Sequence, residues 1–159
     1  MPYDLSKPLV IGISSRALFN LEQENKIFEE QGVEAYEAYQ VAHENEILQK
    51  GAAFQLIKAF LKLNNTGLGR LVEVIIMSRN NANTCLRIFN SIQYYGLDIT
   101  RATLTSGAEI APYLKAFKTD LFLSANSVDV QSAINDGIAA GLILTGAAHA
   151  DAKQKIDQI

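Results

Sequence analysis

The chain has 159 residues, 48% hydrophobic and 19% charged, a balance typical of a globular protein rather than a disordered one. Its 14 Lys and Arg residues against 17 Asp and Glu residues give a net charge of −3, so the composition predicts no general attraction to nucleic acid. The single cysteine, Cys85, excludes an internal disulfide and fits the reducing cytoplasm, and with two histidines it argues against the usual zinc sites.

Short apolar runs along the chain predict five strands. Residues 8–14 are rich in β-branched side chains and nearly uncharged, which is typical of a strand buried on both faces of a parallel sheet. Comparable or weaker runs follow at residues 71–78, 101–105, 120–124 and 138–144. The last run is too short to span a bilayer, and the first eleven residues lack a secretory signal, so we expect no membrane contact.

Segments of helical period lie between these runs, at residues 52–63, 81–95, 111–117 and 127–135. The second of these predicts an apolar stripe that faces a core, formed by Ala82, Cys85, Leu86, Phe89 and Ile92. The start of the third stays open, because Ser106 and Glu109 spell a capping box whereas Pro112 favours the first turn of a helix.

Residues 22–46 depart from the alternation of strands and helices. They hold eight Glu and one Lys among apolar and aromatic residues, with a helical period. We predict one or two helices inserted after the first strand, packed over the edge of the sheet or against a partner.

Alternating strands and helices predict a three-layer, Rossmann-like α/β domain over residues 1–159, with a mostly parallel five-stranded sheet. Such sheets bind ligands beyond the carboxyl ends of their strands. The polar residues at those ends are therefore candidates to bind a phosphate or a nucleotide: Ser14, Ser15, Arg16, Ser78, Arg79, Asn80, Ser124 and Asn126.

Each candidate also has a simpler interpretation. Ser14 and Ser15 can donate to a phosphate or only turn the chain, and Arg16 can bind a phosphate or one of the glutamates that follow it. Residues 78–80 precede a predicted helix, so they can contact an anion, cap the helix, or do both. Asn126 is placed either to bind a ligand or to cap the next helix.

The predicted order of elements, in which polar loops follow the strands, resembles that of haloacid-dehalogenase-like (HAD-like) phosphohydrolases. In those enzymes the loops after the strands carry the catalytic groups. That resemblance implies a nucleophilic Asp after the first strand and Mg²⁺-binding acids after the fourth. No Asp or Glu lies between Gly12 and Leu21, and Ser124, Ala125 and Asn126 follow the fourth strand. We therefore predict a degenerate site with no catalytic residue and no metal ligand, in which Ser78 matches the phosphate-binding hydroxyl.

Longer segments carry a more specific resemblance, in one fixed order from about Leu9 to Leu144. They are residues 10–21, 36–40, 43–46, 78–80, 86–92, 95–101, 113–117 and 121–126. Together they resemble the cytosolic 5′-nucleotidase type I family, with a departure at Asn20, where that family usually has Asp.

The resemblance implies a cytoplasmic, Mg²⁺-dependent enzyme that dephosphorylates nucleoside monophosphates. It also implies a longer protein of two related halves, with the Asp nucleophile and the metal ligands in the second half. We therefore expect this chain to be the N-terminal half and inactive alone, partnered by a nucleoside monophosphate and by a catalytic C-terminal half or a second copy. The alternative is a free-standing module that binds a nucleotide or phosphate. A serine-nucleophile phosphatase is disfavoured, because no base is placed to activate Ser14 or Ser15.

Overall fold

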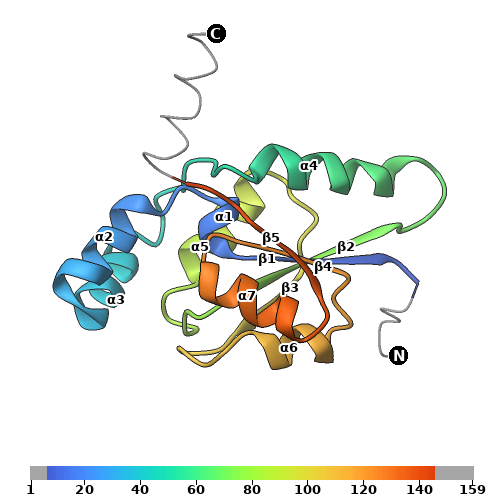
Figure 1. Ribbon diagram of the computed structural model, residues 1–159. Coiled ribbons are helices and arrows are strands. Elements are labelled where there is room, and N and C mark those ends of the chain that lie inside the picture. Colours follow the sequence, from blue (N-terminus) through green and yellow to red (C-terminus); the bar gives the residue numbers. More distant parts are fainter. Residues whose placement is uncertain (1–6, 146–159) are drawn as a thin grey trace, which may run out of the picture.

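The structure is a computed structural model that describes residues 7–145, so the first six and the last fourteen residues of the predicted domain lie outside the described residues. The described part contains five strands: β1 (Leu9–Ile13), β2 (Val72–Ser78), β3 (Arg101–Leu104), β4 (Leu121–Ser124) and β5 (Ala139–Leu142). They form one sheet in the order β3-β2-β1-β4-β5, and every neighbouring pair is parallel. This confirms the predicted α/β, Rossmann-like fold (Figure 1).

The helices follow the predicted alternation with the strands. They are α1 (Ser15–Leu18), α2 (Glu22–Gln31), α3 (Val33–Ala42), α4 (Phe54–Lys62), α5 (Leu86–Tyr94), α6 (Ala111–Ala116) and α7 (Ser127–Asn135), with a 3₁₀ turn η1 (Leu63–Asn65) after α4. Over residues 7–145, no helix combines the length and the apolar character needed to cross a membrane.

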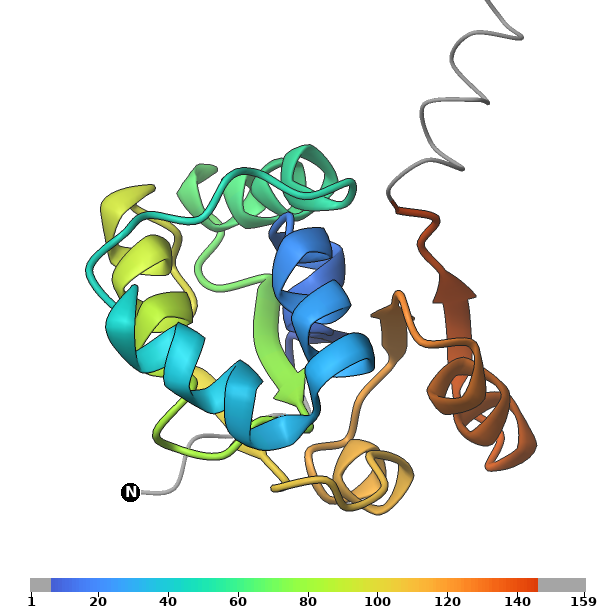
Figure 2. The ribbon, with the colours of Figure 1, turned by 90° about the vertical axis from the view of Figure 1, so that its left-hand side faces the viewer.

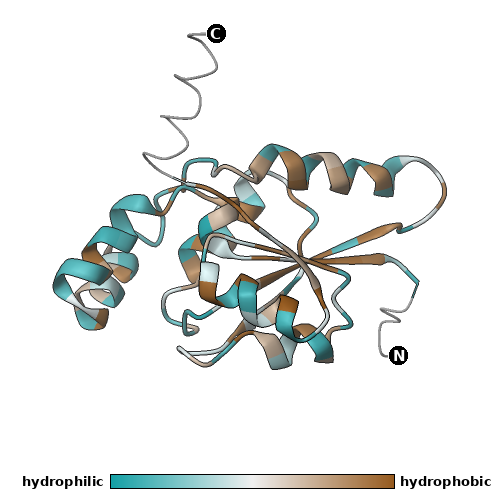
Figure 3. Cartoon of the chain, viewed as in Figure 1, coloured by the Kyte–Doolittle hydropathy of each residue, from teal (hydrophilic) through white to brown (hydrophobic). Residues whose placement is uncertain are grey.

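The strands bury both faces, as parallel strands between helices must. On β1, Ile11 and Ile13 pack with α4 and α5 on one face, whereas Val10 packs with α6 and α7 on the other. The three layers are visible in Figure 1, where α4 lies above the sheet and α6 and α7 lie below it. Figure 3 shows the strands as the hydrophobic layer and the pair α2–α3 as largely hydrophilic.

The apolar stripe predicted for residues 81–95 is wrong at three positions. The residues that were expected to face the core but are exposed are Ala82, Leu86 and Phe89. Ala82 lies in a turn before the helix, where the Asn81 side-chain oxygen accepts from the Thr84 backbone N–H, and α5 begins only at Leu86. Leu86 and Phe89 are exposed because the helix buries Arg87, Ile88, Ser91 and Ile92 instead. Cys85, Ile88 and Ile92 then make the buried face.

The sequence left two possible starts for α6, a capping box at Ser106 or a first turn at Pro112. The structure has the second, because Pro112 lies in the first turn of the helix. Ser106 and Gly107 have φ values of 51° and 92°, so these residues form a loop and no capping box.

The segment predicted to be helical after the first strand carries α2 and α3, joined at Gly32, whose φ of 90° favours glycine. The view along the strand ends in Figure 2 places these two helices in front of the carboxyl edge of the sheet. They therefore stand where a ligand of this fold would bind.

Candidate functional site

A cavity of about 570 Å³ lies at the carboxyl edge of the sheet, between the loops that follow β1, β2, β3 and β4 and the helices α2 and α3. All of the residues proposed from the sequence line it: Ser14, Ser15, Arg16, Ser78, Arg79, Asn80, Ser124 and Asn126. The structure therefore brings together, at one site, side chains that are more than a hundred residues apart in the sequence.

The serine at the end of β1 joins two of these loops. The Ser14 hydroxyl oxygen accepts from the backbone N–H of Ala17, in the first turn of α1, and from the backbone N–H of Ala125 after β4, both at 3.2 Å. Among the described residues this oxygen only accepts, so the hydroxyl proton is left to donate toward the cavity.

The loops after β2 and β4 repeat one local structure. The Ser78 hydroxyl accepts from the Asn80 backbone N–H at 3.1 Å, and the Ser124 hydroxyl accepts from the Asn126 backbone N–H at 3.0 Å. Each strand thus ends in the same serine turn, in which the side chain satisfies an amide two residues on. The two buried hydroxyls shape the floor of the cavity.

Two arginines line the cavity, and their charges are compensated to different degrees. Both oxygens of the Asp129 carboxylate bind the Arg79 guanidinium, and this hydrogen bonding raises the pKa of Arg79 further above its ordinary value. Arg16 has a looser, half-exposed ion pair, with its Nε 3.4 Å from Glu22 Oε1. Arg16 is therefore the cation that is freer to meet an anion in the cavity.

The interpretation of Asn126 as a helix cap is confirmed. Its side-chain oxygen accepts from the backbone N–H groups of Val128 and Asp129, at 3.0 and 3.1 Å, at the start of α7. Asn20 has a similar local contact, because its side-chain oxygen accepts from the Glu22 backbone N–H at 3.2 Å where α2 begins. An Asp at position 20 would offer the same acceptor.

Helix α3 is hydrogen-bonded to the loop after β2. The Tyr36 hydroxyl donates to the Asn80 side-chain oxygen at 2.9 Å, and the Asn81 side-chain nitrogen donates to Glu37 at 2.7 Å. Burial raises the pKa of Tyr36, so the phenol stays protonated and able to donate. These contacts hold α3 over the cavity as one of its walls.

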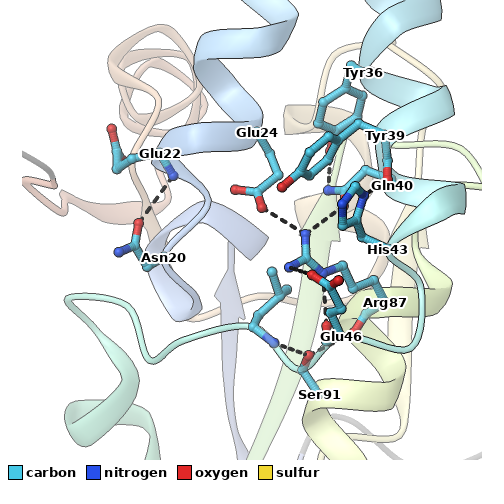
Figure 4. Close-up of polar contacts among 11 residues, drawn as sticks. Asn20, Glu22, Glu24, Tyr36, Tyr39, Gln40, His43, Glu46, Arg87 and Ser91 are labelled. Carbon is cyan, nitrogen blue, oxygen red and sulfur yellow. Dashed lines mark hydrogen bonds and ion pairs between the residues drawn. The ribbon is translucent and has the colours of Figure 1, made fainter.

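A buried arginine on α5 holds α2 and α3 together (Figure 4). Arg87 donates to Glu24 on α2 at 2.7 Å and to Gln40 on α3 at 3.2 Å, and Gln40 in turn donates to the Tyr36 hydroxyl at 3.3 Å. Arg87 and Glu24 are only 6% and 4% exposed, so the charged pair is deeply buried. A continuous chain of polar contacts therefore runs from α5 to the cavity.

Sequence reasoning missed the residues that α2, α3 and the ends of the loops contribute to the cavity. Those additional lining residues include Leu21, Asn25, Phe28, Val33, Glu37, Asn81 and Asp129. One signal was present: a charged Arg87 amid the apolar residues of α5, with a glutamate-rich segment elsewhere in the chain.

The resemblance to HAD-like enzymes implies Mg²⁺, which prefers carboxylate oxygens and water as ligands. The carboxylates among the described residues that line the cavity are Glu37, bound to Asn81, and Asp129, bound on both oxygens by Arg79. A cation at Asp129 would lie against a guanidinium, so these side chains do not fit a magnesium site. Within residues 7–145 no group of three or more His, Cys, Asp or Glu residues could hold a metal ion.

Comparison with known proteins places these observations in a family. The model of the family described as 5′-nucleotidase matches residues 1–159. Human cytosolic 5′-nucleotidase 1B is 40% identical over 146 residues, which cover 87% of this chain and 24% of the human protein. The chain therefore spans about a quarter of the length of this curated relative. No solved structure matches it significantly. On the match along its whole length, the chain belongs to the 5′-nucleotidase family.

Proposed function

We propose that this chain is the N-terminal, non-catalytic half of a cytoplasmic nucleotidase, and that its cavity binds the phosphate of a nucleoside monophosphate. The observation that carries the proposal is the convergence of three strand-end loops, with Ser14, Ser78 and Ser124, on one cavity beside Arg16. A hydroxyl, backbone amides and a weakly paired guanidinium are the groups that bind phosphate in proteins.

The hydrogen bonds of the two carboxylates in the cavity support binding without hydrolysis. A serine nucleophile needs an adjacent base to take its proton. The two carboxylates that line the cavity among the described residues, Glu37 and Asp129, are bound by Asn81 and Arg79. Neither is free to serve as that base for Ser14.

In this proposal the chemistry belongs to a second half of the protein, which supplies the nucleophile and the ligands of Mg²⁺. The described chain forms a single HAD-like domain whose partner is that half, or a second copy of this chain. The 24% of the human relative that this chain covers is compatible with a further catalytic part.

Calorimetric titration of the 159-residue chain with AMP, with Mg²⁺ present, tests the proposal. We expect binding with no release of phosphate. Arg16→Gln should weaken binding about tenfold, because one hydrogen-bonded charge is lost. Lys26→Gln, an exposed lysine on α2 that does not line the cavity, is the charge-matched control and should bind as the parent chain does.

Two results would contradict the proposal in different ways. No heat with AMP at millimolar concentration would exclude the binding site. Phosphate release well above background, abolished by Ser14→Ala or Ser15→Ala, would show that the chain is catalytic by itself.

A further inference from the structure

The cavity has two walls of different chemistry. The loops after β1, β2 and β4 give it serine and asparagine side chains. The opposite wall comes from α2, α3 and the residue before α2, and its apolar and aromatic residues are Leu21, Phe28, Val33 and Tyr36. A site for an inorganic anion needs only the polar wall, so the second wall indicates a ligand with an apolar, flat portion.

Phe28 is the residue of this wall best placed to contact a ligand, because it lines the cavity and 47% of it is exposed. The Tyr36 ring forms a T-shaped pair with it, with the ring centroids 5.9 Å apart and the planes at 84°. In a T-shaped pair the partner ring covers at most one face of Phe28, so Tyr36 does not block the other face.

The orientation of Tyr36 in this pair is fixed by the hydrogen bonds of its hydroxyl group. Tyr36 donates to Asn80 on the polar wall and accepts from Gln40, which Arg87 holds in turn. Tyr36 is therefore held in place before any ligand arrives, so less of its side-chain entropy is lost on binding.

Groups that can hydrogen-bond to the edge of a heterocycle line the same cavity as Phe28. Asn25 is one turn earlier on α2, and the other two are the hydrogen-bonded pair Glu37 and Asn81. Side-chain amides offer both donors and acceptors, which is what the edge of a nucleobase requires.

We propose that the aromatic wall binds the base of the nucleotide, stacked on Phe28, while the phosphate lies at the serine wall near Arg16. The inference rests on the proposed function and adds to it the part of the ligand that gives affinity beyond the phosphate. The volume of about 570 Å³ lies within the range of about 300–1,000 Å³ found for small-molecule sites, so both parts fit in one cavity.

Four probes separate the two walls: AMP, ribose 5-phosphate, adenosine and inorganic phosphate, each titrated into the 159-residue chain. We expect AMP to bind about tenfold more tightly than ribose 5-phosphate, the size of effect that loss of one aromatic–base stack gives. Phe28→Leu, which keeps the apolar bulk, should lower AMP affinity to that of ribose 5-phosphate, and Phe28→Tyr should retain it.

Phe89→Leu is the matched control, because Phe89 is a similarly exposed phenylalanine on α5 that does not line the cavity. It should leave all four affinities unchanged. Thermal unfolding of each variant confirms that the fold is kept; Phe28→Tyr, which preserves the ring, reports on the stack if Phe28→Leu unfolds.

The outcomes distinguish this inference from the proposed function. Equal affinities of AMP and ribose 5-phosphate for the parent chain would overturn the stacking site and leave the phosphate site intact. Binding of adenosine with no binding of either phosphate ester would overturn the phosphate site and support the aromatic wall. No binding of any probe would overturn both.

Discussion

Arg16 and Arg79 both line the cavity, yet the sequence offers no means to tell them apart. The difference arises from partners: Asp129, fifty positions along the chain, binds Arg79 with both of its oxygens, whereas Glu22 binds Arg16 at 3.4 Å in a half-exposed pair. An exposed single ion pair contributes little, whereas a forked arginine–carboxylate pair fixes its geometry. The charge available to a ligand therefore depends on long-range partners.

Releasing Arg79 should increase the affinity of the cavity for anions. In Asp129→Asn the guanidinium loses its counter-charge, and we expect inorganic phosphate to bind several-fold more tightly. The variant should also lose about 1 kcal/mol of unfolding free energy, since Asp129 is an acid in the first turn of α7. Calorimetry and urea unfolding measure the two effects.

The double variant Arg79→Met with Asp129→Asn is the control for this prediction. It should bind phosphate as the parent chain does, or more weakly. If it kept the gain, the added affinity would come from the lost negative charge alone and not from Arg79.

The buried thiol of Cys85 should make the stability of the protein depend on alkaline pH. Burial raises the pKa of Cys85 from 9.0 to about 11, because the thiolate is costly to form there. The folded state thus disfavours the thiolate form of Cys85. The contribution of the neutral thiol to the free energy of unfolding is complete below pH 9 and is lost as the pH rises to 11. The loss amounts to about 3 kcal/mol, at about 1.4 kcal/mol for each pH unit between the two values.

Urea unfolding of the parent chain and of Cys85→Ala between pH 8 and pH 11 measures this contribution. The difference between the two proteins reports the thiol together with its charge effect on Tyr36, whose pKa the Cys85 charge also raises. That difference should shrink above pH 9. A constant difference would mean that the thiol titrates alike in the folded and unfolded states.

At the scale of elements, the pair α2–α3 depends on one buried arginine. Arg87 holds Glu24 and Gln40, and Gln40 leads to Tyr36 on the cavity wall. Arg87→Met leaves the buried Glu24 carboxylate without its guanidinium, which we expect to cost about 3–5 kcal/mol of unfolding free energy. Chemical denaturation measures the loss, and AMP affinity should fall because Gln40, and through it Tyr36, is held less firmly.

A second substitution tests whether the cost comes from the unpaired charge. Adding Glu24→Leu to Arg87→Met replaces the pair with apolar side chains, which is often nearly neutral in stability. We expect most of the lost stability to return while AMP affinity stays low. Failure to recover stability would show that Arg87 acts through its other contacts, such as the Glu46 backbone oxygen.

The bounds of elements were predictable where local signals agreed. Apolar runs located all five strands, and residues 127–135 are a helix as predicted. The buried face of α5 was not predictable, because it includes the polar residues Arg87 and Ser91, whose partners outside this helix lie more than forty residues away in the sequence. Polar pairs across elements, such as Arg87 with Glu24, depend on the tertiary fold and leave little trace in a single sequence.

At the scale of the whole molecule, the parallel sheet explains why the site residues could be predicted from sequence. Every strand runs in the same direction, so the polar residue after each strand reaches the same edge. Ser14, Ser78 and Ser124 meet for this reason alone. The topology does not specify which residues cover that edge of the sheet. The aromatic wall of the cavity therefore could not be predicted from it, because that wall comes from α2 and α3.

The sheet also has two very different kinds of strand. Strand β1 lies between β2 and β4, and Val10, Ile11 and Ile13 are fully buried. Strand β5 is at the edge, and although its sequence is apolar its residues are half-buried or exposed, with Leu142 at 44%. An apolar edge strand is a surface on which another strand can pair.

Hydrogen exchange measured by mass spectrometry should separate these strands. We expect the amides of β1 and β2 to exchange slowest, near the rate set by global unfolding, and those of β5 much faster by local opening. Dilution tests what covers β5: exchange that is fast and independent of protein concentration is expected for a monomer. If β5 were as protected as β1 at high concentration and lost that protection on dilution, copies of this chain would be pairing through the edge of the sheet, and the partner in our proposal would be a second copy.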